Sequence, residues 1–116
     1  MRIHKMTDQK LWKEFHHLNS RFFHDKIVLK EIGYLPTKKM PKNANGFYDG
    51  HNKWIFLDSR LQDFPVLTCM ILIHEMAHAY LDLQDYKGYP ADAGHGMMFQ
   101  AELTRLFKEG AYDGIL

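Results

Sequence analysis

The sequence predicts an α+β fold in which a small three-stranded sheet packs against an N-terminal helix, a central helix and a C-terminal helix. Helix-type spacing of apolar residues occupies residues 7–23, strand-type segments follow between 26 and 58, and two helix-type segments come after them. Strands and helices are thus segregated along the chain, which favours α+β over a doubly wound sheet. A chain of 116 residues is expected to form a single domain, residues 1–116.

The first helix is predicted from TDQKLWKEFHHLNSRFF, residues 7–23. Thr7 and Asp8 precede the periodic pattern and are candidates for the N-cap, because their side-chain oxygens can accept from backbone N–H groups of the first turn. Apolar residues recur at three- and four-residue spacing, which predicts one buried face: Leu11, Phe15, Leu18, Phe22 and Phe23.

Three strands are predicted next. KIVLKEIGYL, residues 26–35, carries β-branched residues in partial alternation and is interpreted as the first strand. PTKKMPKNANG follows as a loop with two prolines and an Asn-Gly pair. GFYDGHNKWIFLD, residues 46–58, is interpreted as two short strands around the turn 49–52.

The remaining elements are helical. Asp58 or Ser59 is predicted to start a short helical turn, and the central helix is predicted over residues 65–83. The final helix is predicted from HGMMFQAELTRLFKEG, residues 95–110, with Gly110 as its stop. Its apolar stripe is predicted at Met98, Leu103 and Leu106.

Composition excludes some classes of protein. The formal net charge of +1 gives no argument for a nucleic-acid or membrane surface partner. Cys69 is the one cysteine and lies in an apolar run, so it is predicted to be a small buried side chain rather than a disulfide or reactive thiol. The N-terminus lacks the apolar stretch of a signal peptide, and the longest apolar run is too short to span a bilayer. We therefore expect a cytoplasmic protein without a membrane partner, and a monomer as the default state.

The central helix carries HEMAH, which places His74 and His78 four residues apart and therefore on one helix face. Two such imidazoles can bind one zinc ion, and Glu75 can then act on a water that the ion holds, as in zincins. The chance expectation of this motif in this composition is roughly 0.02, and burying unpartnered imidazoles and a carboxyl in so apolar a helix would be costly. We predict a zinc site with His74 and His78 as ligands and Glu75 as general base.

A catalytic zinc ion normally has three protein ligands. The metzincin continuation requires a glycine and a histidine where Leu81 and Gln84 stand, so that class is excluded. His95 is favoured as the third ligand because it lies between two glycines, where the backbone can turn tightly. Glu102 on the final helix is the alternative and would give a gluzincin arrangement. The downstream candidates are Asp85, Asp92, His95 and Glu102.

HEMAHAYL, a polar interval and then GHGMMF resemble the SprT-like metallopeptidase domain, whose family includes the Spartan protease of DNA–protein crosslink repair. FHHLNSRFFHDKI resembles the family's first helix, and NGFYDG with KWIFLDSRL resembles two of its strands, so the resemblance covers about residues 8–109. It implies Zn²⁺ as cofactor, His95 as the third ligand beside His74 and His78, and Glu75 as the catalytic residue. The cysteine-rich zinc-binding segment of many family members has no counterpart here, so we expect a bare catalytic domain.

The expected function is a zinc-dependent endopeptidase that hydrolyses peptide bonds in DNA-associated or unfolded proteins. The protein or peptide substrate is expected to bind as an extended strand along residues 46–49. Two alternatives stay open: a non-proteolytic DNA- or protein-binding module with a structural zinc, and a gluzincin-type hydrolase that uses Glu102. Lysines close in sequence to aromatic residues make single-stranded DNA a further candidate partner: Lys38, Lys39, Lys42, Phe47, Tyr48 and Trp54.

Overall fold

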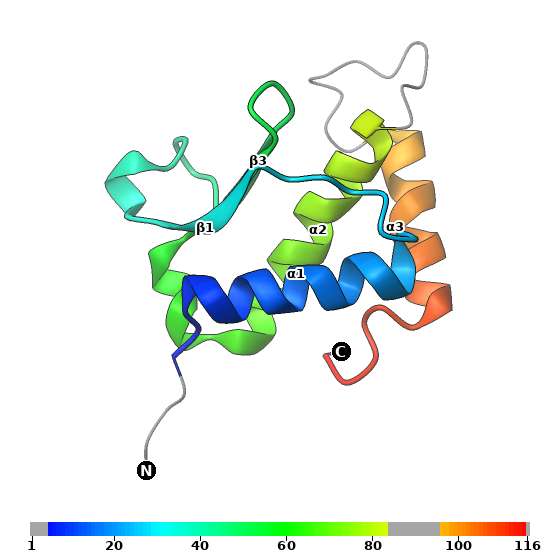
Figure 1. Cartoon of the computed structure of the whole chain (residues 1–116), viewed down its shortest axis with the longest axis horizontal. Helices are drawn as coiled ribbons and strands as arrows, with labels where there is room; N and C mark the ends of the chain where they lie inside the picture. Colours follow the sequence, from blue (N-terminus) through cyan, green and yellow to red (C-terminus); the bar gives the residue numbers. More distant parts are fainter. Residues whose placement is uncertain (1–4, 84–95, 116) are drawn as a thin grey trace.

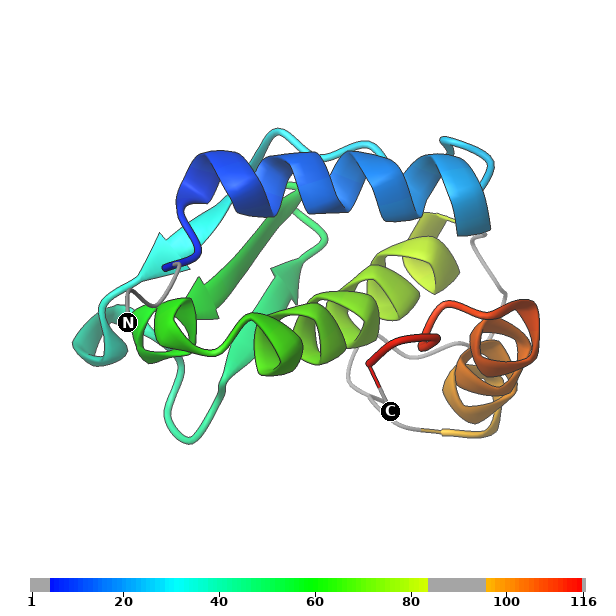
Figure 2. The same cartoon turned by 90° about the horizontal axis from the view of Figure 1, so that it is seen from below.

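Two helices cover one face of a three-stranded sheet, and a third helix packs on the second of them (Figures 1 and 2). The computed structural model describes residues 5–83 and 96–115. Including two short 3-10 helices, η1 and η2, the elements run in the order α1 (Asp8–Phe22), β1 (Glu31–Leu35), η1 (Thr37–Lys39), β2 (Gly46–Asp49), β3 (Trp54–Asp58), η2 (Ser59–Asp63), α2 (Pro65–Leu83) and α3 (Met97–Glu109). The predicted α+β fold and order of helices and strands are confirmed.

The sheet has the strand order β1-β3-β2, with β1 parallel and β2 antiparallel to β3. The predicted hairpin of β2 and β3 is confirmed, and β2 forms one edge of the sheet. The first strand is shorter than predicted, because residues 26–30 do not join it. Ile27 instead uses its backbone N–H and C=O in hydrogen bonds with the side chain of Asn19, at 3.1 and 2.9 Å.

Helix α1 begins as its sequence predicts. Thr7 is the N-cap, and its hydroxyl accepts from the backbone N–H of Lys10 at 3.1 Å. The carboxylate of Asp8 accepts from the backbone N–H of Tyr34 at 3.0 Å, which ties the start of α1 to β1. All five apolar residues predicted to face the core are buried: Leu11, Phe15, Leu18, Phe22 and Phe23.

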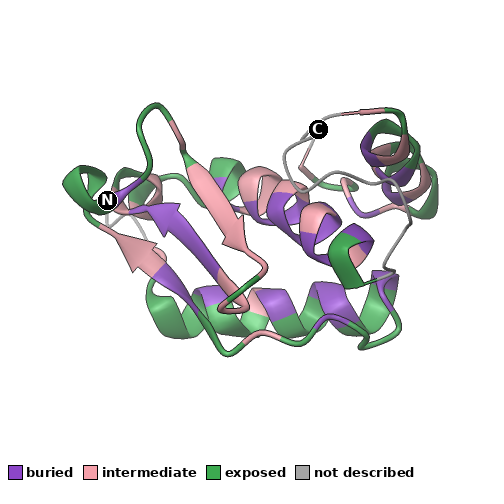
Figure 3. Ribbon diagram, turned by 90° about the horizontal axis from the view of Figure 1, so that it is seen from above, coloured by how far each residue is buried: buried purple, intermediate pink, exposed green. Residues whose placement is uncertain are grey.

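The two faces of the sheet have different roles. Ile55 and Leu57 of β3 lie in the main core with residues of α1 and α2, and neither is accessible to solvent. Phe56 points to the other face, where its ring lies 5.9 Å from Phe47 and 5.7 Å from Trp54. Figure 3 is drawn from this side, and no described helix covers it. The sheet therefore presents an aromatic outer face.

Helix α2 has the predicted bounds, and its buried residues include Leu72, Ile73 and Met76. Among the described residues it is the one helix whose length and mean hydropathy would suit a membrane span. The core helix of a soluble protein passes the same test, and these three side chains of α2 are buried within the fold. The expected cytoplasmic location stays a prediction.

Helix α3 ends at Gly110, whose φ of 94° is left-handed, as predicted for the stop residue. Its predicted apolar stripe was partly wrong. Leu106 is buried, but Met98 and Leu103 are only partly buried, and the fully packed positions beside Leu106 are Phe99 and Glu102. A charged residue is buried on this face because Arg105 pairs with it.

Candidate active site

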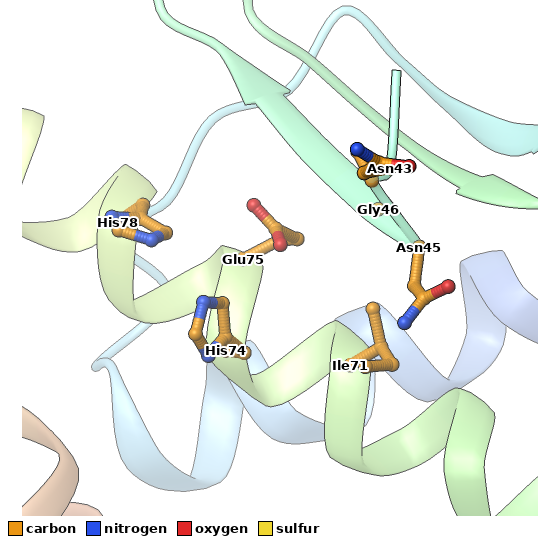
Figure 4. Close-up of a pocket in the computed structure, with 8 residues that line it drawn as sticks. Asn43, Asn45, Gly46, Ile71, His74, Glu75 and His78 are labelled. Atoms are coloured by element: carbon orange, nitrogen blue, oxygen red, sulfur yellow. The ribbon is translucent and has the colours of Figure 1, made fainter. Parts of the chain in front are cut away.

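A pocket of about 440 Å³ lies between α2 and the chain that leads into β2. Its walls are Asn43, Ala44, Asn45 and Gly46 on one side and Ile71, His74, Glu75 and His78 on the other. Figure 4 shows the side chain of Glu75 projecting from α2 toward β2, with His74 and His78 on the same helix. The three residues of the HExxH motif therefore face one cavity.

Two tyrosines of the sheet fix the ends of α2 around this motif. Near its start, the hydroxyl of Tyr34 lies 3.1 Å from Oγ1 of Thr68, and Thr68 donates to the carbonyl of Leu61. Tyr34 is therefore the donor to Thr68. Near the other end, Tyr48 of β2 donates to Asp82 at 2.8 Å. The turn that bears the histidines lies between these two attachments.

The two histidine side chains fit a single metal ion. Two imidazoles that bind one zinc ion at about 2.0–2.1 Å in tetrahedral geometry have ring centroids roughly 5 Å apart. The ring centroids of His74 and His78 are 5.0 Å apart, with an angle of 70° between the ring planes. The spacing of the rings and the nitrogen donors both suit Zn²⁺.

Glu75 is buried, with 7% of its surface exposed. Burial raises the pKa of its carboxyl group to about 7, and a hydrogen bond from the backbone N–H of Tyr48 lowers it in part. A carboxyl group whose pKa lies near neutrality can accept and release a proton at the pH of the cell. The environment of Glu75 therefore suits a general base.

Gly46 allows β2 to approach α2 closely. A methyl group at this position would lie 2.7 Å from Cδ2 of Leu57 and 2.8 Å from Cγ2 of Ile71, closer than carbon atoms pack. It would also lie 3.5 Å from Cγ of Glu75. The missing side chain therefore sets how near β2 lies to α2.

Helix α3 reaches the histidines through Phe99. The ring of Phe99 stacks on His78, with centroids 4.3 Å apart and planes 22° from parallel, and lies 4.9 Å from His74. Glu102, the alternative third ligand, is bound to Arg105 in this structure. Both of its carboxylate oxygens accept from Arg105, at 2.8 and 2.7 Å, and it is not among the residues that line the pocket.

The structure brings together the predicted His74, Glu75 and His78, whereas the predicted third ligand His95 lies outside the described residues. Asp85 and Asp92, the other downstream candidates, also lie outside them. Within residues 5–83 and 96–115 no group of three metal-ligating side chains occurs. Cys69 is half-buried and unbridged, and burial raises the pKa of its thiol to about 11, as expected for an unreactive side chain.

Comparison with protein-family models shows the family of the chain. The model of the SprT-like family matches residues 11–112. The chain belongs to the SprT-like family. The SprT-like match covers all but the first turn of α1, the whole sheet, α2 and α3, and it overlaps nearly all of the resemblance seen in the sequence. It supports a metallopeptidase-like domain of a kind associated with zinc. Neither the curated proteins nor the solved structures compared with the chain gave a match.

Three residues at the SprT-like site were missed by sequence reasoning. Asn43 and Asn45 line the pocket but come from a loop whose composition indicates only a turn. Phe99 is three residues into α3 and was visible only as the aromatic residue of GHGMMF. Its spacing to Leu106, seven residues, was a signal that both lie on one helix face.

Proposed function

We propose that this SprT-like protein is a zinc-dependent endopeptidase in which His74, His78 and His95 hold the ion and Glu75 is the general base. The observation that carries the proposal is the convergence of two imidazoles and a buried carboxyl on one open pocket beside an edge strand. A peptide bond can reach this pocket from solvent, which a purely structural metal site would not require. DNA-associated or unfolded proteins are the proposed substrates.

A zinc ion bound there would supply Lewis acidity, which polarises a carbonyl group and lowers the pKa of a bound water. The carboxylate of Glu75 would take the proton of the attacking water and deliver it to the leaving amine. Its burial excludes bulk water from the carboxylate, and the N–H of Tyr48 holds it in place from the strand. General base catalysis of this kind contributes about 10²–10⁴ in rate.

The edge of β2 offers a place for an extended substrate. Asn45 accepts from the backbone N–H of Asp58 and so faces β3, and backbone groups alternate along a strand. Gly46 and Tyr48 therefore direct their N–H and C=O groups to the open edge, beside the pocket. The backbone N–H of Tyr48 donates to the carboxylate of Glu75. The backbone N–H and C=O of Gly46 are then the groups with which a substrate strand would pair by β-addition.

The test compares the wild-type protein with Glu75→Gln on an unfolded protein substrate, with zinc content measured on both. We expect Glu75→Gln to keep its zinc and to lose at least about 100-fold in cleavage rate, because the amide cannot take a proton. Glu31→Gln, at an exposed position of β1, is the control and should cleave normally. Equal cleavage by wild type and Glu75→Gln would remove the mechanism. A wild-type protein that binds zinc but cleaves no substrate, with or without DNA, would favour the structural-zinc alternative.

Single-stranded DNA is proposed as a further partner. Phe47, Phe56 and Trp54 gather on the open sheet face, where bases stack in many single-strand binding proteins. Lys38 and Lys39 are exposed on η1, and Lys42 lines a separate pocket with Arg60. Binding of a short oligothymidine, followed by fluorescence anisotropy, should weaken in a Lys38→Ala/Lys39→Ala double variant and in Trp54→Ala. It should not weaken in Lys13→Ala, an exposed position on α1, and no binding by the wild type would exclude this partner.

A further inference from the structure

We propose that Phe99 is a positioning residue for the metal-binding histidines: its buried ring holds the imidazole of His78, and in part that of His74, in the orientation that binds the ion. The inference rests on the metal centre proposed above and adds a residue from α3 to it.

The geometry is specific to Phe99. Its side chain is wholly buried, whereas His74 and His78 remain partly exposed toward the pocket. The phenyl ring covers one face of His78 at 4.3 Å in a nearly parallel stack and meets His74 at 4.9 Å with its plane 62° away. One aromatic side chain therefore contacts both histidines, and it does so from α3, which packs on α2 away from the sheet (Figures 1 and 2).

Stacking of this kind has a direct consequence for metal binding. An imidazole binds a metal through a nitrogen lone pair in the plane of its ring, so the orientation of that plane decides whether the nitrogen reaches the ion. A flat ring packed on its face opposes rotation about the Cβ–Cγ bond, and less side-chain entropy is then lost when the ion binds. Most ligating histidines are oriented by hydrogen bonds from outer residues, and loss of such a partner typically weakens metal binding about 10–100-fold.

The helix that carries Phe99 is held in place by contacts that do not involve the histidines. Phe99, Glu102 and Leu106 form the buried face of α3. Arg105 binds Glu102 through two hydrogen bonds, and its guanidinium lies 5.5 Å from the ring centroid of Phe23 and 5.4 Å from that of Tyr80. This cluster joins α3 to the end of α1 and to α2. The stacked ring therefore lies behind the two histidines on a helix that is anchored independently of them.

The experiment measures the zinc dissociation constant by chelator competition for wild type, Phe99→Leu and Phe107→Leu, all as the full chain. Phe107 is the matched control, because it is on the same helix and is 62% exposed. We expect Phe99→Leu to bind zinc about 10-fold more weakly and to change the visible absorption bands of bound Co²⁺, while Phe107→Leu matches wild type. In the metal-free proteins, the ring-current shift of the His78 imidazole protons should disappear in Phe99→Leu.

Phe99→Met, which fills the space with a flexible chain, replaces Phe99→Leu if that variant does not fold. A variant that melts at a lower temperature but binds zinc and Co²⁺ like wild type would overturn the proposal, because Phe99 would then serve stability alone. That result would leave the peptidase proposal intact. Conversely, a wild type that binds zinc without cleaving any substrate would count against the peptidase, and the zinc affinity of Phe99→Leu would still test the positioning role. A wild type that binds no zinc would overturn both.

Discussion

Gly46 of β2 lies against Ile71 of α2 so closely that a single methyl group would come within 2.8 Å of Cγ2 of Ile71. The same methyl group would lie 2.7 Å from Leu57, on the neighbouring strand. This approach brings the edge of β2 next to Glu75, so the distance between that edge and the proposed general base depends on a residue that has no side chain.

Gly46→Ala is therefore expected to destabilise the protein by about 1–3 kcal/mol and to reduce peptide cleavage, because the strand must move away from α2. Gly33→Ala is the comparison. A methyl group there would lie 3.3 Å from the carboxylate of Asp8, a longer distance than the 2.7 Å at Gly46, so its effect should be smaller. Thermal unfolding and cleavage assays on both variants check this. A Gly46→Ala protein as stable and active as Gly33→Ala would show that the close approach does not matter.

Replacement of His95 and Glu102 should separate the two candidate third ligands. We expect His95→Ala to lose zinc, because two imidazoles alone hold the ion weakly. Glu102→Gln should keep zinc and instead lower stability, since the carboxylate that binds Arg105 through two hydrogen bonds is removed. Zinc retention is measured as metal content after dialysis, and stability is measured by urea unfolding. Loss of zinc from Glu102→Gln together with its retention in His95→Ala would establish the gluzincin arrangement.

Asp58 should make stability depend on acidity. Its carboxylate is wholly buried. It accepts hydrogen bonds from the hydroxyl of Thr37 and from Nη2 of Arg60, each at 2.9 Å. The hydrogen bond from Arg60 lowers the pKa of Asp58 to about 2. An aspartate in the unfolded chain has a pKa of about 3.9. The folded value is the lower one, so this stabilisation is complete above about pH 4 and disappears as the pH falls toward about 2.

Asp58→Asn is accordingly expected to be less stable than wild type by about 1–3 kcal/mol at neutral pH, with a difference that shrinks between about pH 4 and pH 2. Urea unfolding at a series of pH values measures it. Asp63→Asn, at an exposed position in η2, should follow the wild type throughout. If the difference in free energy of unfolding between Asp58→Asn and wild type stayed constant down to pH 2, the hydrogen bond from Arg60 would not be stabilising the ionised form of Asp58.

Asn19 should be important for stability although it is far from the pocket. Its buried side chain forms hydrogen bonds with the backbone N–H and C=O of Ile27. Its backbone carbonyl accepts from the backbone N–H groups of Phe23 and Asp25, where the chain turns out of α1. Asn19→Leu would leave two buried backbone groups without partners and is expected to cost about 2–3 kcal/mol. Ser20→Ala, one residue later and exposed, should change little. The urea midpoints of unfolding of both variants test this prediction. Equal midpoints would contradict the stabilising role of the Asn19 side chain.

The sequence by itself determined the helices and the placement of the HExxH motif on one of them. The bounds of α2, the Thr7 cap, the Gly110 stop and the placement of His74, Glu75 and His78 on one helix all follow from local rules, because helix periodicity, capping and ligand spacing act within a few residues. The family match over residues 11–112 agrees with the resemblance that the two motifs carried.

Only the tertiary structure decided what surrounds those residues. The first strand was predicted too long because Asn19 binds Ile27 from another element. The stripe of α3 was partly misplaced because Arg105, Phe23 and Tyr80 make the burial of Glu102 favourable. The nearness of Gly46 to Glu75 and the stack of Phe99 on His78 join segments distant in sequence, and packing between such segments leaves no mark in local periodicity.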